Sequence, residues 1–354
     1  MILCGDIGAT KSLFGLAGMR EGTIHFAFVQ RYENRAWPSF ASLVDDFLAA
    51  SAAATGRPVE LAMAGFGIAG PVSTSGVCMT NLDWQIDGDS LRMLLGGAPA
   101  CLLNDFEASA WGIGDLPPDG RLTLQAGEPD AAAPQLVIGA GSGLGVAFRL
   151  PGDGGHLGLP PRVLPGEGGH VGFAPRDAQQ ARLWQHLQRR FGRVSAEHVV
   201  SGPGLARIHE WLQPQGGERP ALTTPDTDPA RPTGNGAGRG DAVWERAQAG
   251  DPHAREAVEL FVDAYGAVSG DHALSVLARG GVFLTGGIGP RVLPGAATNR
   301  FLAAFRDKGP HAALAARLPV YLVTDERLPL LGAARAAWRL AGERHGGGGV
   351  GRGR

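Results

Sequence analysis

The first residues able to do chemistry lie at the start of the chain, where residues 5–11 read Gly-Asp-Ile-Gly-Ala-Thr-Lys. In this Asp-x-Gly-x-Thr sequence Asp6 can hold Mg²⁺ or its water, Gly8 lets backbone N–H groups approach a phosphate, and Thr10 supplies a hydroxyl donor. A P-loop is excluded, because Thr10 stands where the second glycine of that motif belongs and residues 13–17 alternate like a strand. The segment predicts a hairpin that contacts phosphate, with an ordinary β-turn as the alternative.

A second glycine-rich segment, Gly139–Gly145, lies between the apolar runs 136–138 and 146–148. Its glycines alternate, which differs from the G-x-G-x-x-G sequence of dinucleotide-binding folds, and the run that follows is typical of a strand rather than a helix. We therefore predict a second phosphate-contacting hairpin. Two such hairpins about 130 residues apart suggest a duplicated scaffold that holds one nucleotide from both sides.

Polar side chains that could bind or activate a substrate follow in three places. Asn104 and Asp105 stand where a strand ends and a helix begins, a position of functional side chains in α/β sheets, although an aspartate there can also be a simple helix cap. Glu167 and His170 lie among glycines and make a weak zinc site but a good set of hydrogen-bonding groups for a polyhydroxylated ligand. Glu197 adds another acid, for which stabilisation of a helix dipole is the alternative explanation.

The composition limits the classes of protein to which the chain can belong. It has 354 residues, enough for two domains or one large α/β unit, and its net charge of −2 provides no basic field for a nucleic acid or an anionic membrane. It has 56 glycines where average usage predicts about 25, which indicates tight turns and close approaches to a ligand. Three separated cysteines favour a reducing cytosol, and no apolar run reaches the ~18 residues of a membrane helix.

The elements that must position these residues follow from periodicity and caps. The sequence predicts helices over residues 39–50, 105–111, 176–191, 251–277 and 330–340, and a buried strand over 281–285 that ends at Gly286-Gly287. Residues 214–240 are rich in Pro, Gly, Thr and Asp, so we expect a mobile surface insertion there. The tail 346–354 is rich in glycine and arginine, and we expect it to be disordered.

Taken together, these segments resemble bacterial ATP-dependent glucokinases, in the family's order and across nearly the whole chain. The matching segments are Gly5-Asp6-Ile7-Gly8-Ala9-Thr10, Met79-Thr80-Asn81-Leu82-Asp83-Trp84, Asn104-Asp105-Phe106, Gly139-Ala140-Gly141-Ser142-Gly143-Leu144-Gly145, Leu164–Phe173, Val194–Leu205 and Gly280–Pro290. The resemblance implies the α/β fold of the sugar kinase, Hsp70 and actin superfamily, with two RNase-H-like domains and an interdomain cleft. A smaller domain would span 1–112 and be completed by a C-terminal helix over 327–343, and a larger domain would span 113–326.

The resemblance also implies a role for each motif. Asp105 would be the catalytic base, and the glucose site would comprise Asn104, Asp105, Glu167, His170 and Glu197. The nucleotide would be bound by Gly5, Asp6, Ile7, Gly8, Ala9, Thr10, Gly141, Ser142, Gly143, Gly286 and Gly287, with Asp6 holding Mg²⁺ through water. The implied reaction is the Mg²⁺- and ATP-dependent phosphorylation of D-glucose to glucose 6-phosphate for glycolysis. The implied enzyme is a cytoplasmic homodimer without nucleic-acid or membrane partners.

Two departures from the family pattern and three rival functions bear on these expectations. Ala9 replaces the usual second glycine of the first turn, and Lys11 stands where glucokinases of this group often have Asn, so nucleotide affinity is the property most exposed to change. A kinase for another hexose or aminosugar, or a glucokinase that uses polyphosphate, fits the same motifs. A sugar-sensing transcription regulator on this fold would need a helix-turn-helix module ahead of the first turn, where only four residues stand, so we expect an enzyme.

Overall fold

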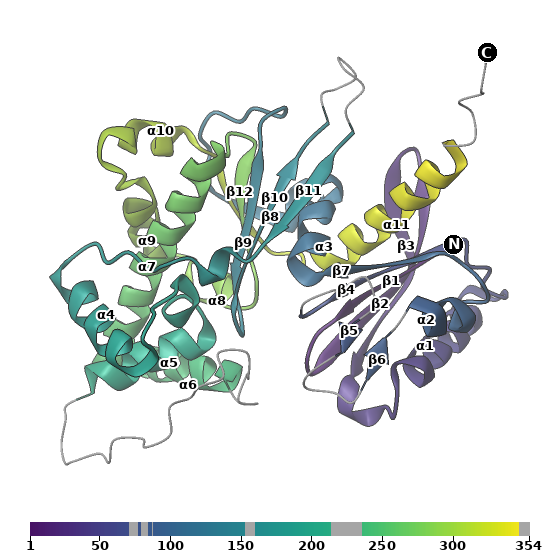
Figure 1. The fold of residues 1–354 in the computed structure, drawn as a ribbon, viewed down its shortest axis with the longest axis horizontal. Helices are drawn as coiled ribbons and strands as arrows, with labels where there is room; N and C mark the ends of the chain where they lie inside the picture. The colour runs from purple at the N-terminus through teal and green to yellow at the C-terminus, as the bar shows by residue number, and fades with distance from the viewer. Residues whose placement is uncertain (71–76, 79–83, 87, 153–159, 214–235, 347–354) are drawn as a thin grey trace. The chain divides into compact units, whose positions relative to one another are not determined.

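The computed structural model describes residues 1–70, 77–78, 84–86, 88–152, 160–213 and 236–346, and the chain divides into two α/β units (Figure 1). The first unit comprises residues 1–120 and 325–354, and the second comprises residues 121–324. The first unit therefore extends past the expected boundary at residue 112. It takes up the chain again at Asp325, just before the C-terminal helix that was expected to complete it.

The first unit is built on one five-stranded sheet. Its strands are β1 (Ile2–Ile7), β2 (Lys11–Arg20), β3 (Thr23–Glu33), β4 (Met63–Ile68) and β7 (Ala100–Asn104), beside a separate short pair, β5 (Val77–Cys78) and β6 (Gln85–Ile86). The sheet order is β3-β2-β1-β4-β7, in which β1 is antiparallel to β2 and parallel to β4, and β4 is parallel to β7. The helices are α1 (Phe40–Thr55), α2 (Gly88–Leu94), α3 (Asp105–Gly112) and α11 (Leu328–Gly346), with 3₁₀ turns η1 (Asn34–Ala36), η2 (Ile113–Asp115) and η3 (Pro118–Gly120).

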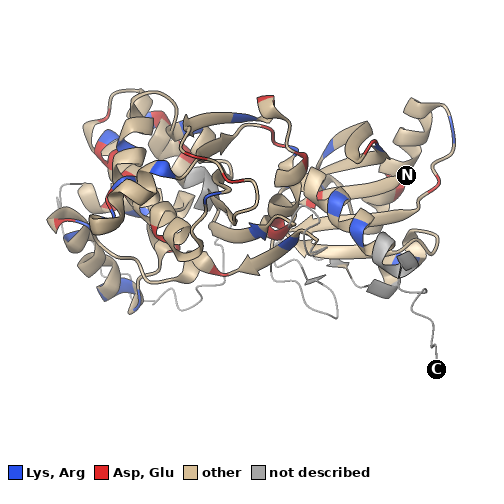
Figure 2. Ribbon diagram, turned by 90° about the horizontal axis from the view of Figure 1, so that it is seen from above, with Lys and Arg blue, Asp and Glu red and all other residues tan. Residues whose placement is uncertain are grey.

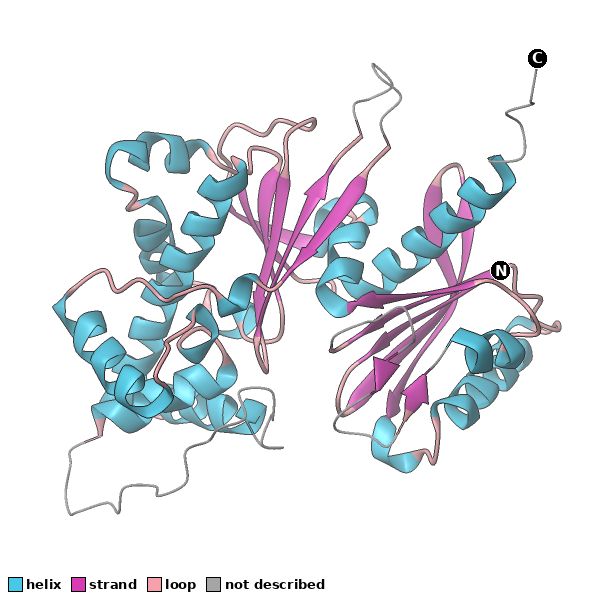
Figure 3. Cartoon of the chain, in the orientation of Figure 1, coloured by secondary structure: helices cyan, strands magenta, loops and turns pink. Residues whose placement is uncertain are grey.

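Alternation along β1 gives this sheet two apolar faces. Leu3 and Ile7 pack into a core with helix α1, whereas Ile2 and Cys4 pack against α11. Figure 3 shows helices on both faces of the sheet. Because successive side chains of a strand point to opposite faces, Asp6 shares the face of Ile2 and Cys4, on which α3 and α11 pack together.

The second unit is built on a six-stranded sheet. Its strands are β8 (Arg121–Gln125), β9 (Gln135–Ala140), β10 (Leu144–Leu150), β11 (Arg162–Gly166), β12 (Gly281–Thr285) and β13 (Val320–Val323). Its helices are α4 (Ala178–Phe191), α5 (Gly202–Leu212), α6 (Gly236–Gln248), α7 (Pro252–Val276), α8 (Gly289–Val292), α9 (Ala296–Arg306) and α10 (Ala312–Arg317). Three 3₁₀ turns are η4 (Gly168–His170), η5 (Ala196–His198) and η6 (Gly309–His311).

Helix α7 is the central helix of the second unit. Its buried Phe261 and Tyr265 pack with α9 and the sheet in one core, and the Tyr265 hydroxyl donates to the carbonyl of Ile138 in β9 at 3.3 Å. Gly266 allows α9 to pack closely, because a Cβ there would overlap the carbonyl oxygen of Phe301. Burial of this kind is the main source of stability for a helix that carries apolar residues on most sides.

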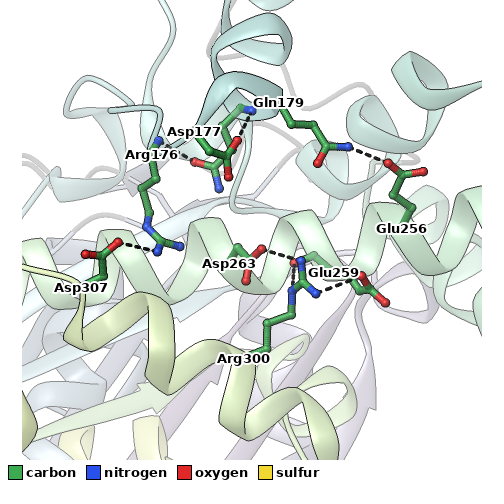
Figure 4. Close-up of polar contacts among 9 residues, drawn as sticks. Arg176, Asp177, Gln179, Glu256, Glu259, Asp263, Arg300 and Asp307 are labelled. Carbon is green, nitrogen blue, oxygen red and sulfur yellow. Dashed lines mark hydrogen bonds and ion pairs between the residues drawn. The ribbon is translucent and has the colours of Figure 1, made fainter.

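Polar pairs at the surface of the second unit tie α4 and α9 to neighbouring segments (Figure 4). The pairs are Arg176–Asp307 at 2.7 Å, Gln179–Glu256 at 2.6 Å, Arg300–Glu259 at 3.0 Å and Arg300–Asp263 at 2.7 Å. Ion pairs near the surface contribute about 0–1 kcal/mol each, so the three formed by Arg176 and Arg300 orient the helices more than they stabilise the fold.

The two sheets repeat one topology. In the second unit the order is β11-β10-β9-β12-β13-β8, where β9, β10 and β11 form an antiparallel meander and β12 and β13 run parallel to β9. Apart from β8, this is the arrangement of β3-β2-β1-β4-β7 in the first unit, and it is the RNase-H-like arrangement that the resemblance implies. The two glycine-rich turns, between β1 and β2 and between β9 and β10, therefore occupy equivalent places.

Most of the predicted elements are confirmed. Both glycine-rich segments are hairpins, the predicted helices all form, and α7 has Asp251 as its N-cap and proline in its first turn. Residues 236–240, expected within the insertion 214–240, instead begin α6, where a Cβ on Gly240 would lie 2.8 Å from the backbone of Gly202 in α5. Packing on α5 therefore overrides the glycine-rich composition. Gly346 ends α11 rather than starting the tail; residues 79–83, 214–235 and 347–354 lie outside the described residues.

Charge is mixed over both units. Figure 2 shows Lys and Arg interspersed with Asp and Glu on each of them, in keeping with the net charge of −2. Among the described residues, no helix combines the length and the apolar character that crossing a membrane requires.

Candidate active site

The turn between β1 and β2 is tight and presents its tip to solvent. The N–H of Gly8 donates to the carbonyl of Lys11 at 3.0 Å, and a Cβ on Gly8 would lie 2.9 Å from that same oxygen. Ala9 and Thr10 are exposed. Among the turn and loop hydrogen bonds of the described residues, none is donated by the backbone N–H of either residue. Ala9 does not have the positive φ that favours glycine, so the departure from glycine introduces no backbone strain there.

One buried side chain holds this turn from beneath. Asn34 is fully buried; its Nδ2 donates to the carbonyl of Gly8 at 2.8 Å and its Oδ1 accepts from the Ser12 hydroxyl at 2.7 Å. The backbone N–H of Asn34 donates to the carbonyl of Thr10 at 2.9 Å. Sequence reasoning missed Asn34, and its only signal was a polar residue at the end of an alternating strand.

Parallel pairing brings Asp6 and Asp105 to one edge of the first sheet. β1 and β7 both run parallel to β4, one on each side of it, so Asp6, the penultimate residue of β1, and Asp105, which directly follows β7, lie at the same edge. Gly67 lies between them, and a Cβ there would come within 2.8 Å of Ala108 in α3, so glycine lets α3 approach the sheet. Burial, together with the nearby Asp105 carboxylate, raises the pKa of Asp6 from 3.8 to about 7, although Arg31 opposes the shift.

The cap of helix α3 is Asn104 and not Asp105. The Asn104 Oδ1 accepts from the N–H of Phe106 at 2.9 Å, and its Nδ2 donates to the carbonyl of Gly70 at 3.3 Å. Asp105 is the first residue inside the helix and is partly buried. The N-cap is therefore Asn104, although the Asp105 Oδ1 also accepts from the N–H of Phe106, at 3.0 Å.

In the second unit the glycine-rich hairpin and the late glycine turn pack against each other. Strand pairing sets Gly139 opposite Thr285, and the N–H of Ile288 donates to the carbonyl of Ala140 at 3.2 Å. Gly286 has a φ of +83°, and a Cβ there would lie 2.5 Å from that carbonyl oxygen. By contrast, a Cβ on Gly141 would meet no atom within 4 Å, so the tip of the hairpin is open.

Glu197 joins this hairpin to the 3₁₀ turn η5. Its Oε2 accepts from the N–H of Leu144 at 2.8 Å, and the next helix begins beside the hairpin, where the N–H of Gly202 donates to the carbonyl of Gly141 at 2.8 Å. A Cβ on Gly143 would lie 2.5 Å from the same Oε2. One carboxylate oxygen of Glu197 is thus engaged in holding the hairpin, a contact that its sequence position gave no means to predict.

Glu167 and His170 follow β11 on a segment with a rigid backbone and exposed side chains. A Cβ on Gly169 would overlap the carbonyl oxygen of Leu144, so the segment lies directly on β10. The end of this segment is bound to the residues that precede Glu197, since the N–H of Phe173 donates to the carbonyl of Val194 at 3.1 Å. The structure therefore brings Glu167, His170 and Glu197 into one region of the second unit.

His198 supports that region as a neutral side chain and was not identified from the sequence. Its ring stacks on Phe191 with centroids 4.4 Å apart, and its Nδ1 accepts from the N–H of Ser195 at 3.0 Å. Burial, aided by Arg207 and other nearby cationic groups, lowers the pKa of His198 to about 4. Among the described residues, no three His, Cys, Asp or Glu side chains lie close enough together to form a metal site by themselves.

A family model described as Glucokinase matches residues 3–340 of the chain. The chain is 36% identical over 351 residues to a glucokinase of Synechocystis sp., and the aligned region covers 95% of this chain and 97% of that relative. Its fold is similar to the crystal structure of a glucokinase from an Antarctic psychrotroph, with a TM-score of 0.79, 25% identity and coverage of 96% and 98% of the two chains. A crystal structure of a ROK family glucokinase from Streptomyces griseus in complex with glucose and AMPPNP shares the fold, with a TM-score of 0.60, 22% identity and coverage of 96% and 99%.

Proposed function

The chain belongs to the glucokinase family, and from that premise we propose that it transfers the γ-phosphoryl group of ATP to the 6-hydroxyl group of D-glucose with Asp105 as the general base. The observation that carries the assignment of the base is the position of Asp105 in the first turn of α3, close to Asp6, with the capping role taken by Asn104. With Asn104 as the N-cap, the start of α3 does not depend on a carboxylate at position 105, and a carboxylate beside a second one at the end of a strand is typical of a functional site.

The proposed reaction needs alignment, charge neutralisation and a proton acceptor. Attack of a sugar hydroxyl on a γ-phosphate in line with the leaving group involves little covalent work by the protein. Asp105 takes the proton of the 6-hydroxyl as the new O–P bond forms, and Asn104 fixes the start of the helix that carries it.

Asp6 fits the role of a magnesium ligand, directly or through water. Its raised pKa reflects a half-buried carboxyl group beside a second one, and a divalent cation would stabilise the ionised form in that environment. Mg²⁺ bound with ATP neutralises charge on the phosphates as the phosphoryl group is transferred.

The remaining residues divide between the two substrates. Exposed Glu167 and His170, with the second carboxylate oxygen of Glu197, supply acceptors and donors for sugar hydroxyls. For the nucleotide, the β1–β2 turn presents Ala9 and Thr10, and the open hairpin tip at Gly141 admits a phosphate close to the backbone. Gly286 and Gly287 would lie near the adenosine.

The test of the proposal is Asp105→Asn, assayed with Mg²⁺-ATP and D-glucose. Asparagine keeps the shape and much of the hydrogen bonding but cannot accept the proton, so kcat should fall by about 10²–10⁴. Glucose affinity by calorimetry and the melting temperature should change little, because Asn104 still caps the helix.

The matched control is Asp177→Asn, the same substitution at the N-terminus of α4, where Asp177 is a true cap that accepts from the N–H of Gln180 at 2.8 Å. Its kcat should stay near wild type because asparagine caps about as well as aspartate. Turnover by Asp105→Asn within about threefold of wild type would remove Asp105 from the mechanism. Faster turnover of mannose or N-acetylmannosamine than of glucose would assign the site to another sugar.

A further inference from the structure

The β1–β2 turn is anchored by a residue that lies outside it. The Asn34 side chain bonds to the carbonyl of Gly8 and the hydroxyl of Ser12, at the start and the end of the turn, and its backbone N–H donates to the carbonyl of Thr10. Asn34 and Ser12 are 0% and 1% exposed, so water cannot replace the bond between their side chains. Removal of the amide would deprive the buried Ser12 hydroxyl and the half-buried Gly8 carbonyl of this partner, a loss that folded proteins reduce by shifting the backbone.

Backbone bonds and one ion pair also hold the turn. Two backbone bonds close it, from the N–H of Gly8 to the carbonyl of Lys11 and from the N–H of Asn34 to the carbonyl of Thr10. The Lys11–Glu33 ion pair at 3.2 Å has both side chains more than half exposed, so solvent screens it. The side chain of Asn34 is therefore the buried contact that adds to these backbone bonds in fixing the segment that carries Ala9 and Thr10.

We propose that Asn34 is a positioning residue for ATP, which fixes the β1–β2 turn in the conformation that receives the phosphates. The inference rests on the proposed function, in which this turn binds the nucleotide. Asn34 is buried beneath the turn and does not touch the nucleotide itself; it acts by keeping Ala9 and Thr10 in place before binding. Donors that are fixed in advance bind and stabilise charge better than donors that must be ordered on binding.

The inference predicts a specific kinetic pattern. Because Asn34 bonds to the turn and not to the β7–α3 junction, its loss should raise KM for Mg²⁺-ATP and lower kcat while leaving glucose affinity unchanged. A general loss of stability would affect both substrates alike. Small displacements of substrate-positioning groups can reduce rates by up to about 10²-fold, so we expect changes of about 10-fold for Asn34→Ala.

The experiment compares a graded series with a matched control. Ser12→Ala removes one bond, Asn34→Asp replaces the donor to Gly8 with an acceptor, and Asn34→Ala removes both side-chain bonds. The control is Ser51→Ala, which deletes a buried hydroxyl of the same unit that donates to the carbonyl of Leu48 at 2.9 Å, within α1. For each variant, KM for both substrates, kcat, the melting temperature and the Kd for Mg²⁺-AMPPNP by calorimetry are measured.

The expected result is a rise in KM for ATP and in Kd for AMPPNP from Ser12→Ala to Asn34→Ala, with neither changed in Ser51→Ala. Unchanged nucleotide constants in Ser12→Ala and Asn34→Asp would overturn the inference, and those two variants decide it if Asn34→Ala does not fold. Wild-type protein that binds AMPPNP but phosphorylates no glucose would refute the proposed function alone, since the nucleotide Kd of the variants still tests Asn34. Wild-type protein that binds no nucleotide would overturn both.

Discussion

At the scale of single residues, Asp6 and Asp105 place two carboxyl groups at one edge of a sheet under different conditions. Asp6 is half-buried beside the Asp105 carboxylate, and its pKa of about 7 means that the folded protein in the absence of a cation resists its ionisation. The charged form that a magnesium ligand requires is thus the form that the fold tolerates least. Such opposition between stability and activity is typical of functional sites.

The first prediction concerns Asp6→Asn in protein without Mg²⁺ or nucleotide. The folded pKa of Asp6 lies above the ordinary 3.8, so the wild type loses stability as pH rises from about 4 through 7, and the loss is complete above 7. The variant lacks this penalty. Its free energy of unfolding should exceed that of the wild type by about 1–3 kcal/mol at pH 8 and equal it at pH 4. Its kcat should nevertheless fall by at least about 10²-fold, since a charge at the reacting centre is lost.

Chemical denaturation at pH 4, 6 and 8 measures the difference. Asp45→Asn, at an exposed carboxylate on α1, is the control and should show no pH-dependent gain. Parallel stability profiles for wild type and Asp6→Asn would show that the carboxyl group of Asp6 is not destabilised by its surroundings.

At the scale of elements, what the sequence predicted depended on how local each signal was. Helices with a cap and a regular apolar face, such as α1 behind Ser39 and α7 behind Asp251, were predicted correctly because every determinant lies within a few residues. The start of α6 was missed because it depends on α5. Asn34 and the bond of Glu197 to Leu144 were missed for the same reason: their partners lie 22 to 26 and 53 residues away.

The β9–β10 hairpin supports a prediction in which two neighbouring glycines have different roles. A Cβ on Gly143 would press on the Glu197 carboxylate, so Gly143→Ala should lower stability by about 1–3 kcal/mol. A Cβ on Gly141 meets open space, so Gly141→Ala should keep its melting temperature and instead raise KM for ATP by obstructing the phosphates. Melting curves and ATP titrations on both variants separate the effects, and a normal KM for ATP in Gly141→Ala would exclude this tip from nucleotide binding.

At the scale of the whole molecule, the last helix of the chain is structurally part of the first unit. α11 packs on β1 and β4 and crosses α3, the helix that begins with Asp105. The crossing is close because Gly332 faces the backbone of α3, where a Cβ would overlap the carbonyl oxygen of Ala108. Gly112 makes the reciprocal contact, since a Cβ there would overlap the carbonyl oxygen of Leu328.

The corresponding prediction is that Gly332→Ala damages a site formed by residues more than two hundred positions earlier. Overlap with the backbone forces α3 and α11 apart, which should cost about 2–3 kcal/mol of stability and reduce kcat by about 10-fold as Asp105 moves. The control is Gly18→Ala in β2, where the nearest atom to a Cβ is the Met1 sulfur at 4.0 Å. Wild-type stability and turnover in Gly332→Ala would show that the crossing tolerates separation.

The late position of α11 also dictates an order of events during synthesis on the ribosome. Residues 121–324 form one uninterrupted stretch and can begin to fold as they emerge, because domains fold as units during translation. The first 120 residues contain Asp6 and Asp105 but must wait with an uncovered apolar face until α11 is released. Chains that stop between residue 197 and α11 therefore hold every acidic residue proposed for the chemistry and yet should be inactive, so ATP is consumed only once α11 has been made.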